Sequence, residues 1–222
     1  MDTFGYCSNK LTRSVIFFLF IYDPVGLFGL FIIIKLVLSE INPFNCSVLI
    51  SKLSFSESFN GTAVPLKLSE KDNFEINTEQ LKGLISDKTS LIIINNPNNP
   101  TGSYMNKKKI TDLVNLLEQY PNVSILSDEI YSNIIFNNEQ MPSLLDYESI
   151  KDRLIVLEGW SKTYCMTGWR LGWSIWPENL IEHANKICVN YNSCATSISQ
   201  YAGLEAIKGC LLYTSPSPRD RY

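Results

Sequence analysis

Histidine is nearly absent from this chain of 222 residues, since His183 is the only one. The six cysteines form no Cys-x-x-Cys pair. A zinc site or a disulfide framework needs closely spaced cysteine or histidine side chains, so the composition argues against both. We therefore expect no metal, and free, buried thiols in a reducing compartment. His183 is assigned no role.

The sequence also lacks a strong charge of either sign. Charged residues make up 18% of the chain and the formal net charge is −3. No basic stripe is present, and the three lysines at 107–109 fit the solvated first turn of a helix. We therefore expect no nucleic-acid partner.

An uninterrupted apolar run of membrane-spanning length is missing as well. Residues 15–38 are apolar, but Asp23, Pro24 and Lys35 interrupt them. A membrane-spanning helix needs about 20 apolar residues with few charges. We expect no membrane partner, and a cytoplasmic protein whose 45% hydrophobic residues form a substantial core.

Strand and helix patterns alternate through the middle of the chain. Asn77, with Gln80 three residues later, predicts a helix start, and the helix should end near Ile85. Apolar residues at helical spacing predict a second helix over about 106–119. Strands are expected at 91–95, 123–127, 154–157 and 171–175, and helices at 178–189 and 197–208. This order predicts an α/β fold with a mostly parallel sheet covered by helices on both faces.

One lysine and one arginine stand in a fixed relation. The segments SKT at 161–163 and MTGWRLG at 166–172 place Lys162 eight residues before Arg170. Lysine forms Schiff bases with aldehydes such as pyridoxal phosphate, and the arginine fork matches a phosphate. Alone, such a pair is most often two solvated surface charges.

Two upstream segments change that interpretation. Residues 91–102 read LIIINNPNNPTG, and residues 123–131 read VSILSDEIY. Each is an apolar strand that runs directly into polar residues, here those around Asn99 and Asp128. Ligands of open α/β sheets bind at the carboxyl ends of the strands.

Taken in order, these segments resemble the class I/II aminotransferases, which are fold-type I pyridoxal-phosphate enzymes. Each motif is weak alone, but the ordered set is specific. The resemblance covers about residues 25–209 and implies the large cofactor domain of an aspartate aminotransferase-like enzyme. It also implies pyridoxal 5'-phosphate as cofactor, amino acid and 2-oxo acid substrates, and a homodimer in the full-length family form.

The resemblance assigns six residues to the cofactor. It implies that Lys162 carries the Schiff base, with Ser161 beside it, that Arg170 binds the phosphate, that Asp128 pairs with the pyridine nitrogen, and that Tyr131 and Asn99 bind the phenolic oxygen. Structural roles stay open for three of them. Asp128 could cap a helix beginning at Glu129, Tyr131 could be an ordinary helix aromatic, and Asn99 could be a turn residue before Pro100.

Other positions depart from the family pattern. A phosphate-binding serine is often found three residues before the lysine, where this chain has Gly159. The expected phosphate turn would fall at 26–28, where Leu27 and Phe28 follow Gly26. Phe55 is the candidate for the aromatic that stacks on the cofactor ring.

The ends of the chain do not fit the pattern. We leave residues 1–24 unplaced, assign residues 25–209 to a partial cofactor-binding large domain, and expect 210–222 to be a disordered, non-family tail because its Ser-Pro-Ser-Pro run cannot continue a helix. The expected function is transamination, with this chain a partial catalytic domain. A β-lyase, a cyclising synthase or a non-catalytic cofactor-binding fragment are the alternatives.

Overall fold

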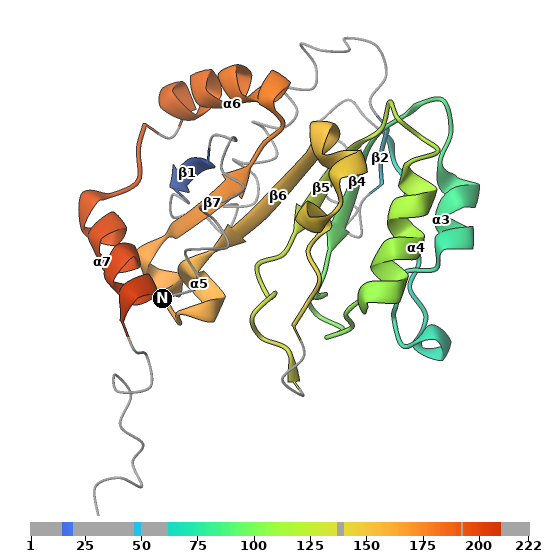
Figure 1. The fold of residues 1–222 in the computed structure, drawn as a ribbon, viewed down its shortest axis with the longest axis horizontal. Helices are drawn as coiled ribbons and strands as arrows, with labels where there is room; N and C mark the ends of the chain where they lie inside the picture. The colour runs from blue at the N-terminus through green and yellow to red at the C-terminus, as the bar shows by residue number, and fades with distance from the viewer. Residues whose placement is uncertain (1–14, 20–46, 50–61, 137–139, 192, 210–222) are drawn as a thin grey trace, which may run out of the picture.

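The computed structural model describes residues 15–19, 47–49, 62–136, 140–191 and 193–209 (Figure 1). Within these ranges seven strands form one sheet in the order β1-β7-β6-β5-β4-β2-β3. Their bounds are β1 (Val15–Leu19), β2 (Ser47–Leu49), β3 (Thr62–Ala63), β4 (Thr89–Asn95), β5 (Ser124–Asp128), β6 (Leu154–Gly159) and β7 (Leu171–Ile175).

Only β7 runs against the other strands. It pairs antiparallel with β6 and with β1, whereas β2, β3, β4, β5 and β6 pair in parallel. A parallel pair needs a long crossover connection, and helices lie in the described connections from β4 to β5 and from β5 to β6. The expected α/β fold with a mostly parallel sheet is confirmed.

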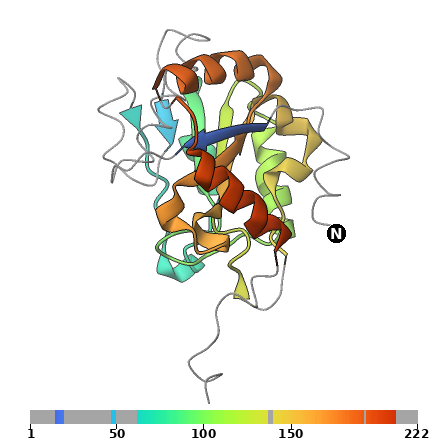
Figure 2. The ribbon, with the colours of Figure 1, turned by 90° about the vertical axis from the view of Figure 1, so that its left-hand side faces the viewer.

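The helices flank this sheet. They are α3 (Thr78–Leu84), α4 (Lys107–Leu117), the single turn α5 (Trp160–Thr163), α6 (Glu178–Tyr191) and α7 (Ser197–Lys208). Four short 3-10 helices are η3 (Glu70–Asp72), η5 (Leu144–Asp146), η6 (Glu148–Arg153) and η7 (Thr167–Trp169). Figures 1 and 2 show α3 and α4 beside β4, and α6 and α7 at the β7 end of the sheet.

Side-chain caps fix the starts of α3 and α4. Asn77 accepts a hydrogen bond from the backbone N–H of Gln80, and Asn106 accepts one from Lys109, each at 3.1 Å. These bonds satisfy donors that have no partner within the helix. The helix starts predicted from Asn77 and near residue 106 are confirmed.

The main core lies between α4 and one face of the sheet. Ile110, Leu113 and Leu117 of α4 are fully buried against alternate residues of the strands, including Ile92 and Ile125. The intervening strand residues on the opposite face are also buried, namely Leu91, Leu126 and Ile155. Both faces of the central strands are therefore covered.

A second core joins α7 to α5 and β7. The indole Nε1 of Trp160 donates to the carbonyl of Gly203 at 2.9 Å. A Cβ on Gly203 would lie 2.4 Å from Leu171 Cδ2 and 3.1 Å from the Trp160 ring. Only glycine lets α7 approach this closely, so α7 is fixed against the turn that carries Lys162.

Two interpretations from the sequence do not hold. The segment after Asp128 forms turns rather than the helix considered as an alternative, with bonds from the Ser132 N–H to the Glu129 carbonyl and from the Ile134 N–H to the Tyr131 carbonyl, while the Asp128 carboxylate accepts the Ile130 N–H at 3.3 Å. Of the free cysteines that the structure describes, Cys188 is buried but Cys165 and Cys194 are exposed, since both lie in connections between elements. No helix in the described part of the chain has the length and hydropathy needed to cross a membrane.

Candidate active site

The site is built at the carboxyl ends of β4 and β5. Asn95 and Asp128 are the last residues of these strands and stand opposite each other in the register. The Asn95 side chain donates to the backbone oxygen of Asp128 at 3.3 Å and accepts the backbone N–H of Asn99 at 2.9 Å. Asn95 therefore ties the turn after β4 to the end of β5.

Three of the predicted residues meet at this edge. The amide Nδ2 of Asn99 donates to the hydroxyl of Tyr131 at 2.9 Å. The Lys162 ammonium lies 5.5 Å from the centre of the Tyr131 ring, within the range of a cation–π contact. Side chains from three separate segments of the chain thus lie close together.

Asp128 joins the same group electrostatically. Burial raises the pKa of its carboxyl from 3.8 to about 6, against the opposing effects of the Ile130 N–H and the charge of Lys162. Among the residues that the structure describes, the charge of Lys162 does not offset the effect of burial on this carboxylate. The protonated pyridine nitrogen of pyridoxal phosphate is a cation of suitable size, so the cofactor fits the residues present.

Lys162 and Arg170 are brought together by the β6 and β7 pair. Lys162 lies on α5 immediately after β6, with Ser161 beside it, and Arg170 lies immediately before β7. Gly159 and Gly172 pair across the antiparallel strands, so Lys162 and Arg170 leave the sheet at the same end. The short helix η7 between them contacts α5.

Arg170 adopts an unusual backbone conformation. Its φ of 52° is in the left-handed region, which is uncommon for a residue with a side chain. The guanidinium Nη1 donates to the carbonyl of Thr167 at 2.9 Å. The sharp turn of MTGWRLG thus directs the chain from η7 back into β7.

The packing explains the glycine found where the family often has serine. A Cβ on Gly159 would lie 3.0 Å from the Cα of Gly172 and 3.2 Å from Ile130 Cδ1. Because two of the nearest atoms belong to the backbone, a side chain at position 159 would require the paired strands to shift by a few tenths of an ångström. Any hydrogen bond from this residue to a phosphate would have to come from the backbone.

Glu158 is a residue of the site that the sequence did not reveal. Its carboxylate accepts the Ser132 hydroxyl at 2.5 Å and the Gly159 N–H at 3.0 Å. Burial, helped by the nearby carboxylates of Glu129 and Asp128, raises its pKa from 4.5 to about 7 against the opposing effects of its two hydrogen bonds. A glutamate near a strand end is usually solvated, and no motif marks this one. The role of Asn95 in joining the turn after β4 to the end of β5 was also missed, although Asn95 lies within the LIIINNPNNPTG segment.

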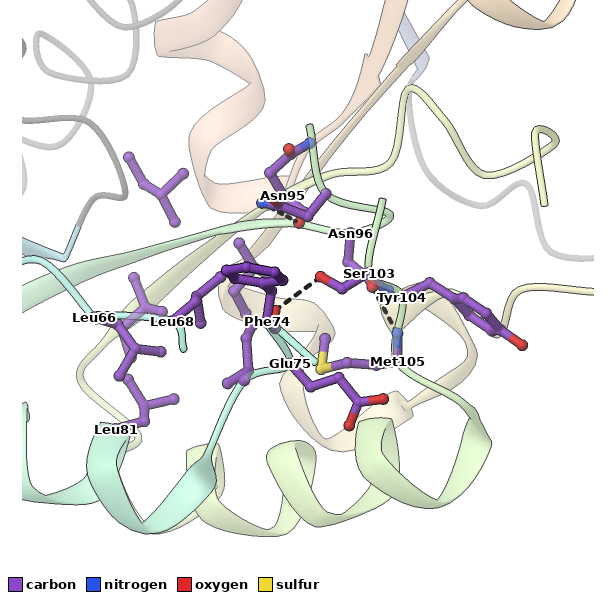
Figure 3. A pocket seen from close by; sticks show the side chains of 15 residues that line it. Leu66, Leu68, Phe74, Glu75, Leu81, Asn95, Asn96, Ser103, Tyr104 and Met105 are labelled. Carbon is purple, nitrogen blue, oxygen red and sulfur yellow. Dashed lines mark hydrogen bonds between the residues drawn. The ribbon is translucent and has the colours of Figure 1, made fainter. Parts of the chain in front are cut away.

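A small hollow lies behind the turn after β4 (Figure 3). It has a volume of about 50 Å³ and is mostly apolar, with Leu66, Phe74 and Met105 in its wall. Ser103 Oγ donates to the Phe74 carbonyl at 2.8 Å, and the Met105 N–H donates to Asn96 at 2.9 Å. Its wall includes none of the six predicted cofactor residues. The candidate positions at 26–28 and at Phe55 lie outside the described residues.

Comparison with known proteins agrees with this geometry. The family model described as "Aminotransferase class I and II" matches residues 54–217. The Rickettsia typhi protein named "Probable aspartate/prephenate aminotransferase" is 37% identical over 158 residues, which are 71% of this chain and 40% of that protein. The aspartate aminotransferase of Sulfolobus acidocaldarius is 38% identical over 64% of this chain and 35% of its own length.

Solved structures show the same fold. The aromatic aminotransferase of Pyrococcus horikoshii superposes with a TM-score of 0.77 at 25% identity, over 91% of this chain and 53% of that one. The aspartate aminotransferase of Rhizobium meliloti also gives a TM-score of 0.77, at 23% identity, over 96% and 53%. Both are fold-type I aminotransferases.

The fold is that of the fold-type I aminotransferases. With the family model matching well over half of its residues, this chain belongs to the class I and II aminotransferases. It spans about 40% of the length of the curated relatives that it matches.

Proposed function

We propose that this chain forms part of a pyridoxal-phosphate-dependent aminotransferase that moves an amino group between an amino acid and a 2-oxo acid. The observation that carries the proposal is the convergence of Lys162, Tyr131 and Asn99 beside the half-buried Asp128. Bound pyridoxal phosphate supplies an aldehyde for a lysine and an electron sink for the substrate's carbanion.

Each residue then has a chemical task. Lys162 would hold the cofactor through its aldehyde, and its amine would carry the proton to and from the substrate's α-carbon. Asp128 keeps the pyridine nitrogen protonated through its charge. The joined Asn99 and Tyr131 side chains present an amide and a hydroxyl to the phenolic oxygen.

The phosphate end of the site involves the turn around Arg170. The guanidinium offers a planar fork for a phosphate dianion. Ser161, next to Lys162, is a further hydroxyl donor of the same turn. We assign the cofactor-binding large domain to residues 25–209 on this basis.

We also propose that the protein works as a homodimer in the cytoplasm. On α7, Ile198 and Tyr201 are 70% and 74% exposed, and the neighbouring Leu204 is also exposed. These residues recur every three positions, so they form one apolar stripe. A second copy of the chain would cover that stripe.

Covalent labelling tests the proposal. Pyridoxal phosphate is added to the purified chain, the complex is reduced with borohydride, and peptides are mapped by mass spectrometry. We expect one modified lysine, Lys162, and no labelling in the matched Lys162→Arg variant at that peptide. Modification of the exposed lysines at 107–109 in preference to Lys162 would contradict the assignment.

Amination of a 2-oxo acid separates transamination from β-lyase or synthase chemistry. A reduced protein that carries the label at Lys162 shows binding, whereas formation of a new amino acid from aspartate and 2-oxoglutarate shows transfer. The assay is run under conditions in which a full-length relative is active. Cofactor binding without amino transfer under those conditions would support the cofactor site but contradict the transamination proposal.

A further inference from the structure

Glu158 connects the two segments that carry the candidate site's tyrosine and lysine. It is the penultimate residue of β6, four residues before Lys162. Its Oε2 accepts the hydroxyl of Ser132 at 2.5 Å, and Ser132 directly follows Tyr131. Its Oε1 accepts the N–H of Gly159 at 3.0 Å, so both carboxylate oxygens have a partner.

A second, weaker bond joins the same segments. The Asn133 amide donates to the Thr163 hydroxyl at 3.4 Å and to the Ser132 hydroxyl at 3.2 Å. Thr163 directly follows Lys162. The turn after Tyr131 is therefore attached to the chain on both sides of Lys162, by Glu158 before it and by Thr163 after it.

We propose that Glu158 is a positioning residue: it holds the turn that carries Tyr131 at a fixed distance from the helix that carries Lys162. This inference rests on the cofactor roles proposed above for those two residues. Glu158 makes its bonds to Ser132 and Gly159, and it acts on the cofactor through Tyr131. Without it, the Tyr131 hydroxyl would no longer be held against Asn99 and the cofactor's phenolic oxygen.

The surroundings of Glu158 favour a hydrogen-bonding role over an ionic one. The titratable groups that influence it are Asp128 and Glu129 at the end of β5, and Glu158 in turn raises the pKa of Tyr164 at the end of α5. All three are acidic or neutral groups. A glutamine at position 158 keeps an oxygen that can accept the Ser132 hydroxyl, whereas an alanine keeps none.

The test measures pyridoxal phosphate binding to the whole chain. Binding is followed by the cofactor's visible absorption, both as a titration and as the pH midpoint of the band in the bound complex. The variants are Glu158→Ala, Glu158→Gln, Tyr131→Phe and the Glu158→Ala/Tyr131→Phe double variant. Glu79→Ala, which changes an exposed glutamate on α3, is the matched control.

We expect Glu158→Ala to weaken cofactor binding about tenfold, the size of one lost uncharged hydrogen bond. It should also shift the pH midpoint in the same direction as Tyr131→Phe, and the double variant should shift no further. Glu158→Gln should restore binding to within about twofold, and the Glu79 control should match the wild type.

Thermal melting shows whether Glu158→Ala folds. If it does not, cofactor binding and the pH midpoint are compared between Glu158→Gln and Ser132→Ala instead. Additive shifts in the double variant, or unchanged binding and pH midpoint in folded Glu158→Ala protein, would overturn the inference and leave the proposed function intact. A wild-type chain that does not bind pyridoxal phosphate would instead overturn the proposed function, and this inference with it.

Discussion

Replacing Asp128 with asparagine is expected to stabilise the cofactor-free chain at pH 8, although it weakens cofactor binding. Burial raises the pKa of the Asp128 carboxyl from 3.8 to about 6. The folded state therefore disfavours the charge that this residue carries at neutral pH. Asparagine has nearly the same shape and retains an oxygen for the Ile130 N–H, but it has no charge.

The size of the gain follows from the pKa change. One pKa unit corresponds to about 1.4 kcal/mol, so ionised Asp128 costs the fold about 3 kcal/mol at most. As the pH rises from 3.8 to about 6, the folded state holds a proton that the unfolded state releases, so stability falls through this window. The penalty is nearly complete above about pH 7 and is about 1 kcal/mol at pH 4.5.

Urea unfolding at pH 8 and at pH 4.5 measures this difference. Asp128→Asn should raise the free energy of unfolding by about 1–3 kcal/mol at pH 8 and by much less at pH 4.5. Asp112→Asn, an exposed position on α4, should change stability by less than about 0.5 kcal/mol at both pH values. An equal gain at both pH values, or a loss at pH 8, would refute the burial argument.

Two further predictions concern α7. Gly203→Ala should destabilise the fold by about 1–3 kcal/mol in urea unfolding, because the new Cβ would overpack the Trp160 contact. The control Gly83→Ala, where a Cβ would meet nothing within 4 Å, should stabilise α3 by up to about 1 kcal/mol. Equal effects of the two substitutions would contradict the packing argument. Tyr201→Lys should shift a self-associating chain toward monomer in sedimentation velocity with little change in its melting temperature, whereas an unchanged assembly would remove α7 from the proposed interface.

Much of the fold was predictable from local signals. Asn77 and Asn106 cap their helices as amide side chains do in short peptides, and the helical spacing of Ile110, Leu113 and Leu117 defines the buried face of α4. Such patterns depend on near neighbours in the chain. The reversed direction of β7 is not a local property, because it depends on where η7 and the Arg170 turn redirect the strand.

The candidate site divides in the same way. Asn99, Asp128, Tyr131 and Lys162 could be proposed because ordered motifs mark them, but their contacts required the sheet register. Glu158 and Gly159 have no motif of their own. Their importance comes from contacts with distant parts of the chain: Ser132, in the turn after β5, for Glu158, and Gly172 of β7 for Gly159.

The acidic residues at the ends of β5 and β6 show why such a site reduces stability. Burial raises the pKa of Asp128, Glu129 and Glu158, so each resists ionisation in the folded chain. Packing alone would favour neutral side chains at all three positions. Glu129 is buried with hydrogen bonds from Ser127 and from the Leu144 N–H, which indicates a structural role.

Asp128 differs from Glu129 in the groups that offset the cost of burying its charge. Its compensating contacts are the Ile130 N–H and the more distant charge of Lys162, and they leave the pKa near 6. Binding a cation beside Asp128 would lower that pKa and recover the free energy spent on burying the carboxylate. The ligand that the site is proposed to hold would thus offset the cost of burying the charge of Asp128. At pH 8, cofactor binding should therefore stabilise the wild-type fold more than it stabilises the Asp128→Asn variant.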